Sequence, residues 1–426
     1  MKKKKVIVIG GGFAGIQLAR NLDRNLFEVL LIDRINHHQF QPLFYQVATS
    51  QIEPSNISFP FRHIFKNKRH VQIILAEVLA VYPENNSINT TIGAFDYDYL
   101  VIAIVCKTNF FGNNVICEHS FTLKTTYDAI KIRNHILQTF EDIISAKEAE
   151  KEGLLNLIIV GAGATGVELA GAFAEIKKEV LPRDYPRIDF TKFKITLIEG
   201  SKNTLNNMSD MAKAASRKYL EKMGVEMLTE TFVTGYDGNS LKLNNGNEIN
   251  TKTVIWTAGV IGNTVPGLPI SAITFGNRLK VNRLNKVDET KNVFAIGDIA
   301  YMQTPKYPKG HPQLANVAVN QGKNLAKNFK RIGQGKSPLE YEYKDLGAMA
   351  TVGKNKAVVD LPFITFKGYF AWLMWMFLHL MLILSTRNKL LIFINWAWVY
   401  ITKDSSLRLI LTQNKETCNV EKTSTP

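Results

Sequence analysis

The amino-acid sequence predicts an α/β protein with two Rossmann-like, three-layer domains, followed by a short helical segment. Two stretches, beginning at residues 6 and 157, carry an apolar strand, a glycine-rich turn and a helix in the same order. The third observation is a pair of apolar, aromatic-rich runs at residues 369–384 and 390–402. With 426 residues, 46% of them hydrophobic and 21% charged, the chain has the length and composition of a folded protein of more than one domain.

The first glycine-rich turn follows the apolar run at residues 6–9 and reads Gly10-x-Gly12-x-x-Gly15. In such a turn the first glycine permits the bend, the second lets the backbone approach a pyrophosphate, and the third lets the helix pack on the strand. The next apolar run ends in Asp33, where a carboxylate can accept hydrogen bonds from a ribose hydroxyl. Since strand, turn, helix and acidic residue occur in this order, we predict a dinucleotide-binding domain here rather than a plain loop.

The second turn repeats the pattern and reads Gly161-x-Gly163-x-x-Gly166. The next apolar strand ends in Glu199, after an insertion rich in proline and charge at residues 181–190. A glutamate at this place favours the free 2′-hydroxyl of NAD and repels the 2′-phosphate of NADP. Lys202 lies nearby and weakens that preference. We predict NADH as the ligand of this second domain.

The first domain is expected to resume after the second, because the apolar run at residues 292–296 leads into Gly297-Asp298. A carboxylate there can hold the polyol of a flavin chain, although Gly-Asp is also a common turn. The arrangement resembles that of flavoprotein reductases with two dinucleotide-binding domains, whose first site holds FAD and whose second holds NAD(P)H. We expect an FAD domain over 1–118 and 272–350, an NADH domain over 119–271, a membrane-anchoring segment over 351–403, and a polar tail over 404–426.

The three cysteines, Cys106, Cys117 and Cys418, form no CxxC or CxxxxC pair. Reductases of the glutathione reductase kind need such a pair beside the flavin, so thiol–disulfide chemistry is excluded. The spacing also fits no metal or iron–sulfur ligand set and no disulfide framework, which favours a reducing cytoplasmic location.

The chain is strongly basic, with 52 Lys and Arg against 37 Asp and Glu, a net charge of +15. Such a charge favours an anionic partner. No nucleic-acid-binding motif accompanies it, so we expect a lipid surface and no nucleic acid. The apolar run after the N-terminal lysines is too short for a signal peptide, and we expect membrane attachment to come from elsewhere in the chain.

The two apolar runs near the carboxyl end are too short to span a bilayer, which takes about 20 apolar residues. They contain Trp372, Trp375, Trp396 and Trp398, they are flanked by lysine and arginine, and His379 is the strongly polar residue of the first run. Such helices fit a monotopic anchor lying in the membrane interface, with tryptophan at headgroup depth. The alternative is a buried helical hairpin or a dimer interface.

Longer stretches of the chain resemble type II NADH dehydrogenase, the single-subunit respiratory NADH:quinone oxidoreductase. The matching stretches, which together cover nearly the whole chain, are HHQFQPLFYQVAT (37–49), VGAGATGVELAGAFAE (160–175), IWTAGV (255–260), VFAIGDIA (293–300), GAMATVGKNKAVVD (347–360) and KGYFAWLMWMFLHL (367–380). The last two, sitting together, are specific to this family.

The resemblance implies roles for individual residues. FAD would be bound by Gly10, Gly12, Phe13, Ala14, Gly15, Asp33, Arg34, Gln46, Val78, Gly297, Asp298 and Ala318. NADH would be bound by Gly161, Gly163, Gly166, Glu199, Ala258 and Gly259. Glu168 would position the nicotinamide or handle a proton as the catalytic residue, although a carboxylate in a first helical turn is also favoured by the helix dipole. The quinone side would be formed by Ala315, Asn316, Asn320 and Lys367, the lysine at the mouth of a tunnel.

Two departures from the family pattern bear on these roles. Val105 stands where the family has glycine, and its side chain would crowd the flavin. Asn316 and Asn320 stand where the family has glutamine, so each amide is one methylene shorter and reaches a quinone only through water or not at all.

The sequence therefore predicts a respiratory flavoprotein that passes a hydride from NADH to FAD and electrons to a membrane quinone, without proton pumping. The resemblance implies a peripheral enzyme on the cytoplasmic face of the inner (plasma) membrane, and a homodimer formed through the carboxyl-terminal region. Two alternatives are a sulfide:quinone oxidoreductase, for which the cysteines are poorly spaced, and a non-catalytic membrane-bound relative.

Overall fold

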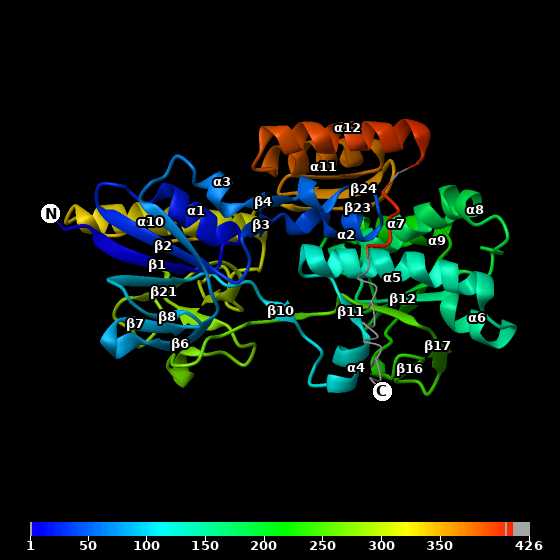
Figure 1. Cartoon of the computed structure of the whole chain (residues 1–426), viewed down its shortest axis with the longest axis horizontal. Coiled ribbons are helices and arrows are strands. Elements are labelled where there is room, and N and C mark those ends of the chain that lie inside the picture. The colour runs from blue at the N-terminus through cyan, green and yellow to red at the C-terminus, as the bar shows by residue number, and fades with distance from the viewer. Residues whose placement is uncertain (1, 405–406, 412–426) are drawn as a thin grey trace, which may run out of the picture.

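The computed structural model describes residues 2–404 and 407–411, and its two parallel sheets form two lobes (Figure 1). The strands of the first sheet, in spatial order, are β21 (Val293–Ala295), β9 (Tyr99–Ile102), β1 (Lys4–Ile9), β2 (Phe27–Asp33) and β5 (Val71–Leu75). Those of the second are β11 (Phe121–Thr122), β18 (Thr253–Trp256), β12 (Asn156–Val160), β13 (Lys194–Glu199) and β14 (Val225–Thr229). The predicted α/β architecture with two parallel sheets is confirmed.

The central strands are apolar at successive positions because both of their faces are covered. In β1, Val6 and Val8 face one core with helix α1 (Phe13–Asn21), whereas Ile7 and Ile9 face a second core on the opposite side of the sheet. The same alternation divides the residues of β12 between two cores. Each sheet therefore lies between two other layers, as the sequence predicts.

Helices cover one face of each sheet. Their bounds are α1 (Phe13–Asn21), α2 (Phe44–Ala48), α3 (Phe61–Ile64), α4 (Asn114–His119), α5 (Thr126–Ser145), α6 (Glu148–Leu154), α7 (Ala164–Glu179), α8 (Leu181–Asp184), α9 (Asp210–Lys222), α10 (Ala315–Gly333), α11 (Tyr369–Leu382) and α12 (Thr386–Thr402). Residues of α1 and α10 share one core with the first sheet, and residues of α5 and α7 share one with the second.

Smaller sheets of two or three strands, most of them antiparallel, complete the fold. The three-stranded ones are β6 (Val78–Tyr82), β7 (Ser87–Thr90) and β8 (Gly93–Asp96); β15 (Val233–Tyr236), β16 (Ser240–Leu243) and β17 (Glu248–Asn250); and β23 (Ala348–Gly353), β24 (Lys356–Leu361) and β25 (Ile364–Lys367). The two-stranded ones are antiparallel in β10 (Lys107–Thr108) with β19 (Val260–Ile261) and in β3 (His37–Gln39) with β4 (Ser58–Pro60), and parallel in β20 (Leu279–Val281) with β22 (Ala300–Met302). The β10–β19 pair runs between the two lobes (Figure 1).

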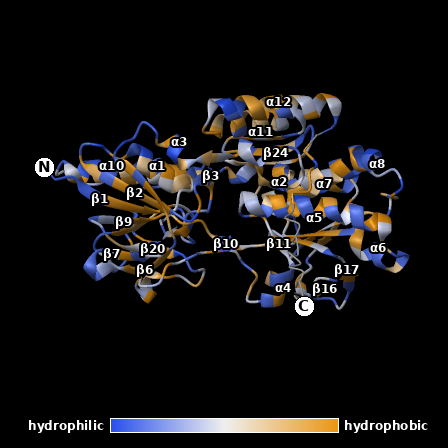
Figure 2. Cartoon of the chain, in the orientation of Figure 1, coloured by the Kyte–Doolittle hydropathy of each residue, from blue (hydrophilic) through white to orange (hydrophobic). Residues whose placement is uncertain are grey.

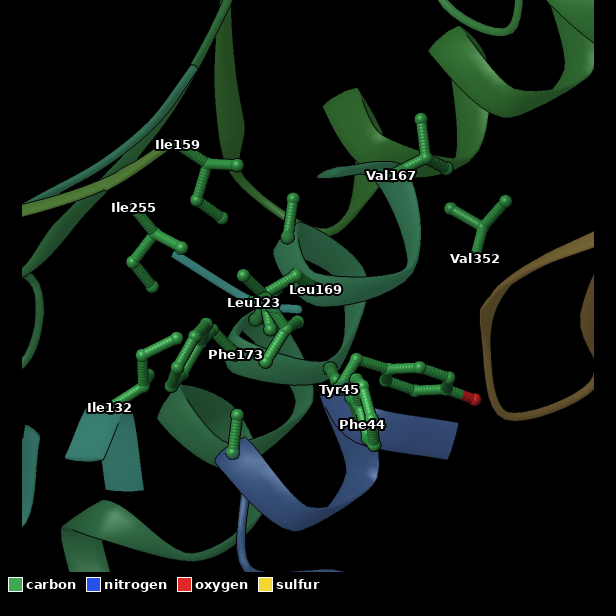
Figure 3. Packing of buried hydrophobic residues seen from close by; sticks show 14 of the residues in the cluster. Phe44, Tyr45, Leu123, Ile132, Ile159, Val167, Leu169, Phe173, Ile255 and Val352 are labelled. Atoms are coloured by element: carbon green, nitrogen blue, oxygen red, sulfur yellow. The ribbon is translucent and has the colours of Figure 1, made fainter. Parts of the chain in front are cut away.

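Helix α2 belongs by sequence to the first predicted domain but packs against the second sheet's helices. Figure 3 shows Phe44 and Tyr45 beside Phe173 of α7, and all three are buried in one core with residues of the second sheet. Val352 of β23 packs against α7 in the same core. The segment around α2 therefore crosses from one lobe to the other, and the predicted domain boundaries remain a prediction.

The carboxyl-terminal region forms the β23–β25 sheet with α11 and α12 packed along one side (Figures 1 and 2). Both helices expose large hydrophobic side chains, among them Phe370, Phe377 and Ile401, with 75%, 64% and 79% exposed. The expectation of tryptophan at headgroup depth is wrong for Trp375 and Trp396, which are buried against α2 and α7. Among the described residues, no helix has the length and apolar character needed to cross a bilayer. Most of the predicted polar tail, with Cys418, lies outside the described residues.

Candidate active site

One cavity of about 770 Å³, which we call the main cavity, opens where the carboxyl ends of the first sheet's strands meet the amino end of α7. The sequence-predicted site residues that line it are Gly10, Gly12, Phe13, Ala14, Asp33, Arg34, Val78, Glu168, Gly297, Asp298, Ala315 and Ala318. Glu168 comes from α7 of the second lobe, and the others come from the first lobe, including α10. In open parallel sheets of this kind, ligands usually bind just outside the carboxyl ends of the strands.

The first glycine turn is shaped for close approach of backbone to backbone. Gly10 has a φ of +101°, and a β-carbon there would lie 2.7 Å from the Ala103 carbonyl oxygen. A β-carbon on Gly15 would lie 2.0 Å from the Gly10 carbonyl oxygen. Helix α1 then begins at Phe13 with no side-chain cap and no acidic residue in its first turn. Its first N–H groups therefore point at the cavity as an anion site, which fits the pyrophosphate of FAD.

Asp33 closes this turn at the end of β2. Its carboxylate accepts hydrogen bonds from the Gly11 and Ile35 backbone N–H groups, at 2.6 and 3.0 Å. The side chain is thereby fixed at the edge of the main cavity, beside Arg34. This position fits the ribose role that the sequence predicts for Asp33.

Val105 projects toward the same turn. Its Cγ2 atom would lie 3.3 Å from a β-carbon built on Gly12, and the residue lines the main cavity. The side chain predicted to crowd the flavin therefore faces the glycine that a flavin pyrophosphate approaches. Its effect on flavin affinity remains a prediction.

Asp298 lies in the short helical turn Gly297–Ile299 that follows β21, and it also lines the main cavity. Burial raises the pKa of its carboxyl, while the nearby Lys124 and Arg278 lower it. The Asp298 carbonyl accepts a hydrogen bond from Arg278 Nε at 2.9 Å. Gln321 of α10 accepts one from the Gly297 N–H at 2.7 Å, and this fixes the turn. Lys124 and Gln321 were missed by sequence reasoning, because neither stands in a motif near Gly297.

The second glycine turn has the same geometry in the second lobe. Gly161 has a φ of +101°, and a β-carbon there would meet the Ala258 nitrogen at 2.7 Å. Within residues 2–404 and 407–411, no heavy atom lies within 4 Å of a β-carbon on Gly163, so this side of the turn is open. Glu199 accepts hydrogen bonds from the Ala162 and Ser201 N–H groups, at 2.7 and 2.8 Å. The turn thus matches the first one and fits the pyrophosphate and ribose of NADH.

Ala258 and Gly259, also predicted to bind NADH, follow strand β18 of the second sheet. Gly259 has a φ of +74°, and a β-carbon there would lie 3.0 Å from the Phe111 ring. The Trp256 indole donates to the Ala258 carbonyl at 3.0 Å, which holds this loop in place.

Glu168 lies in the second turn of α7, between the main cavity and a small cavity of about 100 Å³. Burial raises the pKa of its carboxyl to about 8, and the Thr351 N–H, 3.5 Å from Oε1, lowers this pKa. The Trp375 indole N–H also lowers this pKa, although its nitrogen has no acceptor in hydrogen-bonding geometry among the residues described. At neutral pH the side chain is therefore mainly protonated and can donate a proton.

The predicted quinone-side residues are not gathered in one place. Ala315 lines the main cavity, but Asn316 donates through Nδ2 to the Tyr343 hydroxyl at 3.3 Å. Asn320 is half-buried on α10 outside that lining, and Lys367 is exposed at the end of β25. Their role toward a quinone remains a prediction.

His379 of α11 reaches the main cavity instead. Its Nδ1 donates to the Trp375 carbonyl at 2.8 Å, and its ring stacks on that of Trp375 at 4.0 Å. Burial lowers its pKa to about 4, so the imidazole is neutral at pH 7. The sequence shows His379 as a polar residue in an apolar run, but only the packing of α11 shows where it points.

Gln46, predicted to contact FAD, lies in the small cavity rather than in the main one. Its Nε2 donates to the Tyr45 hydroxyl, and its Oε1 accepts from Trp396 Nε1, both at 2.8 Å. The residue thereby joins α2 to α12. Of the two cavities that Glu168 lines, Gln46 lines only the small one.

Cys106 is buried beside Asp298, and its Sγ accepts a hydrogen bond from Gln313 Nε2 at 2.9 Å. Burial raises its pKa to about 11, so the thiol is not ionised at neutral pH. Cys117 is exposed on α4. Within the described part of the chain there is therefore no cysteine pair next to the main cavity, and no cluster of three metal-ligating side chains.

Residues 4–322 match the family model described as pyridine nucleotide-disulphide oxidoreductase. The fold and the two glycine turns thus define a flavoprotein oxidoreductase of this class. Residues 346–404 match the NDH2 C-terminal domain. The chain is 30% identical over 417 residues to the type II NADH:quinone oxidoreductase Ndh of Mycobacterium tuberculosis, covering 94% of this chain and 89% of that protein. The chain therefore belongs to the type II NADH:quinone oxidoreductases, and the family predicted from the sequence is confirmed.

The chain is also similar to other proteins. A type II NADH:quinone oxidoreductase of Staphylococcus aureus is 28% identical, covering 84% of this chain and 89% of that protein. The structure of NDH2 from Plasmodium falciparum in complex with NADH superposes with a TM-score of 0.89 at 22% identity, covering 96% of this chain and all of that one. The sulfide:quinone oxidoreductase of Aquifex aeolicus shares the fold, with a TM-score of 0.72, 21% identity, and coverage of 94% of this chain and 96% of that one.

Proposed function

We propose that this chain oxidises NADH and reduces a membrane quinone at the main cavity, with FAD as the resident cofactor. One observation carries the proposal: a single cavity is lined by the first glycine turn, by Glu168 of α7 and by His379 of α11. When bound, FAD accepts a hydride and can release electrons singly or in pairs. In this proposal the glycine turn supplies a phosphate site and Glu168 a protonated carboxyl. His379 marks the side on which a quinone would enter, from the carboxyl-terminal helices.

The residues of the chain have separate tasks in this proposal. Gly12 and Asp33 would hold the ADP half of FAD, and Asp298 its ribityl chain. Gly163 and Glu199 would hold the corresponding half of NADH in the second lobe. Each pair combines open N–H groups at a helix end with a carboxylate fixed by backbone hydrogen bonds.

Glu168 would hold a proton next to the reacting atoms, because its carboxyl stays protonated up to about pH 8. Quinone reduction to quinol takes up protons as well as electrons, so a protonated side chain is useful there. Neutral His379 and the apolar surface of α11 would admit the quinone from the side of the two exposed helices. The proposed reaction includes no proton-pumping step.

The test is the visible spectrum of the purified protein. NADH should bleach the flavin absorption, and a soluble quinone should restore it. Sulfide in place of NADH should leave the spectrum unchanged, because Cys106 has no cysteine partner among the described residues. Protein that binds flavin but shows no quinone-dependent NADH oxidation would refute the proposal, and bleaching by sulfide would revive the sulfide:quinone alternative.

We also propose that α11 and α12 attach the protein to a membrane surface without crossing it. Their exposed side chains, including Phe370, Phe377 and Ile401, form an apolar face whose exposure to water is unfavourable. Phe370→Glu combined with Phe377→Glu should release the protein from anionic vesicles in a flotation assay. Phe275→Glu is the matched control, because Phe275 is fully exposed outside the carboxyl-terminal region. Equal flotation of the two variants would contradict the proposal.

The cytoplasmic orientation and the homodimer are further parts of this proposal. NADH oxidation should be observed with inverted membrane vesicles and not with right-side-out ones. The dimer should be seen by analytical ultracentrifugation and should depend on the carboxyl-terminal region. A monomer at micromolar concentration would contradict the dimer and leave the redox proposal intact.

A further inference from the structure

The charged side chains that line the main cavity are unevenly balanced. Its acidic residues are Asp33, Glu77, Glu168 and Asp298, and its lysine and arginine residues are Lys124 and Arg34. Burial lowers the pKa values of its histidines, His37, His38 and His379, which are therefore neutral at pH 7. Arg34 Nη1 lies 3.6 Å from Glu77 Oε1, so this cation is already paired. Lys124 is the cation left to meet a ligand.

Lys124 stands immediately before α5, and its backbone is fixed there. Its N–H donates to the Asp128 carboxylate at 2.9 Å, and the same oxygen accepts from the Thr125 N–H at 3.0 Å. The Lys124 side chain is half-buried, and Nζ has no hydrogen-bond or ion-pair partner in the described part of the chain. Nζ is also not one of the fully buried nitrogens that lack a partner there, so it borders open space. Since Lys124 lines the main cavity, the ammonium group is available to a ligand in it.

The neighbours of the ammonium group show which part of the cavity it reaches. Burial lowers the pKa of Lys124, whereas the charges of Asp298 and Cys106 raise it. Lys124 is in turn the cation that most lowers the pKa of the Asp298 carboxyl. Asp298 is the residue proposed to hold the ribityl chain, which joins the pyrophosphate of FAD to the flavin ring. Lys124 therefore lies near the ring-bearing half of the cofactor.

The position of Lys124 between the lobes agrees with this. FAD is proposed to bind in the first lobe and NADH in the second, so a hydride can pass only where the two lobes face each other. Lys124 precedes a helix of the second lobe and yet lines the main cavity beside Ala164 and Glu168 of α7. The paired Arg34 instead follows Asp33, the residue proposed to hold the ribose of FAD.

We propose that Lys124 supplies the positive charge that stabilises the reduced flavin. A hydride brings two electrons and one proton, so its transfer from NADH leaves NAD⁺ and a flavin ring that carries one negative charge. A cation close to the ring favours this anionic form and opposes the uptake of a second proton. The inference rests on the proposed binding of FAD in the main cavity.

The test is the midpoint potential of the flavin in full-length protein, measured by reduction against a reference dye. Lys124→Met should shift the balance from reduced to oxidised flavin by at least about 10-fold, as expected for a unit charge about 10 Å away at an effective dielectric constant of about 20. A tenfold shift of a two-electron couple corresponds to a fall of about 30 mV. Lys124→Arg keeps the charge and should keep the potential of the unchanged protein.

Lys131→Met is the matched control. Lys131 lies on the exposed side of α5, does not line the main cavity and contributes the same net charge. Its replacement should leave the potential unchanged. An equal fall in both methionine variants, or an unchanged potential in Lys124→Met, would overturn the proposal. A merely structural Lys124 would lower the melting temperature of Lys124→Met without moving the potential, and this result would count against the proposal too.

The near-ultraviolet spectrum of the reduced flavin adds a measurement that needs no variant, because the anionic and neutral reduced forms absorb differently. At about pH 6 the unchanged protein should hold the anionic form and Lys124→Met the neutral form, since removing the cation raises the pKa of the reduced ring. A neutral form in the unchanged protein would overturn the proposal even if the variant failed to fold.

Two results with the oxidised cofactor complete the test. A folded Lys124→Met protein that no longer binds oxidised FAD would overturn the proposal, because Lys124 would then hold the cofactor before any electron arrives. Unchanged protein that binds no FAD would instead refute the function proposed above. The failure of this inference and the failure of the proposed function are therefore distinguishable.

Discussion

Replacing Glu168 by glutamine tests how the buried carboxyl is used. Its pKa is raised from 4.5 to about 8, chiefly by burial. One pKa unit corresponds to about 1.4 kcal/mol, so the shift amounts to about 5 kcal/mol as an upper bound, because part of the side chain faces the main cavity. Glutamine keeps an oxygen for the Thr351 N–H but cannot ionise.

The sign of the pH effect follows from proton binding. Below pH 4.5 the carboxyl is protonated in both the folded and the unfolded chain. Between pH 4.5 and about 8 the unfolded chain releases the proton and the folded chain keeps it, so the free energy of unfolding falls as pH rises. Glu168→Gln should lack this slope. It should therefore be as stable as the unchanged protein near pH 5 and clearly more stable above pH 8.

The assay has two readouts. Infrared difference spectra of the unchanged protein against Glu168→Gln, taken from pH 4 to pH 10, report the ionisation of this carboxyl directly. Steady-state NADH:quinone activity should fall by about 100-fold in Glu168→Gln, which is the usual contribution of a positioned proton donor. The change of rate with pH near pH 8, which the unchanged protein should show, should be absent from the variant. Glu175→Gln is the control on the same helix, since Glu175 is also buried with a raised pKa but does not line the main cavity. A carboxyl at position 168 that titrates near pH 4.5 would refute the reasoning.

Three further predictions concern the cofactor turns and the acceptor side. Val105→Gly should bind FAD several-fold more tightly in a fluorescence titration, because it removes the Val105 Cγ2 atom that faces Gly12. An unchanged affinity for FAD would contradict the prediction that Val105 crowds the flavin. Gly166→Ala should melt at a lower temperature, since a β-carbon would lie 1.9 Å from a carbonyl oxygen of its own turn, whereas Gly163→Ala should fold normally and lose only NADH affinity. His379→Ala should raise the KM for quinone and leave the KM for NADH unchanged. With a pKa of about 4, His379 should also add no pH dependence between pH 5 and 8, and a histidine-dependent limb near pH 6.5 would argue against its burial.

The two glycine turns could be predicted from the sequence because their requirements are local. A buried parallel strand needs a continuous apolar run, and the bend after it needs Gly10 or Gly161 at positive φ. Asp33 and Glu199 end the next strand in each lobe, and both accept backbone N–H groups of their own turns. Strand, turn and carboxylate lie within one βαβ unit, so their order in the sequence is enough to predict their relative positions.

The composition of the cavities could not be predicted in this way. Lys124, Gln313 and His379 come from distant parts of the chain to line the main cavity. Gln46, predicted beside the flavin, is held by Trp396 in the small cavity. These placements depend on how α2, α7 and the carboxyl-terminal helices pack together, and side-chain spacing along one element does not report that packing.

The sequence alone thus determined the class of fold, the two cofactor turns and the family, because these rest on short-range patterns of glycine, apolar and acidic residues. The tertiary structure alone decided that Glu168 is buried enough to stay protonated, that His379 reaches the main cavity and that Arg133 Nε and Nη2 are enclosed with no hydrogen-bond partner in the described part of the chain. Burial is a property of everything packed around a side chain, contributed by residues far away in sequence. The cost of removing a charge from water is therefore set only when the chain has folded.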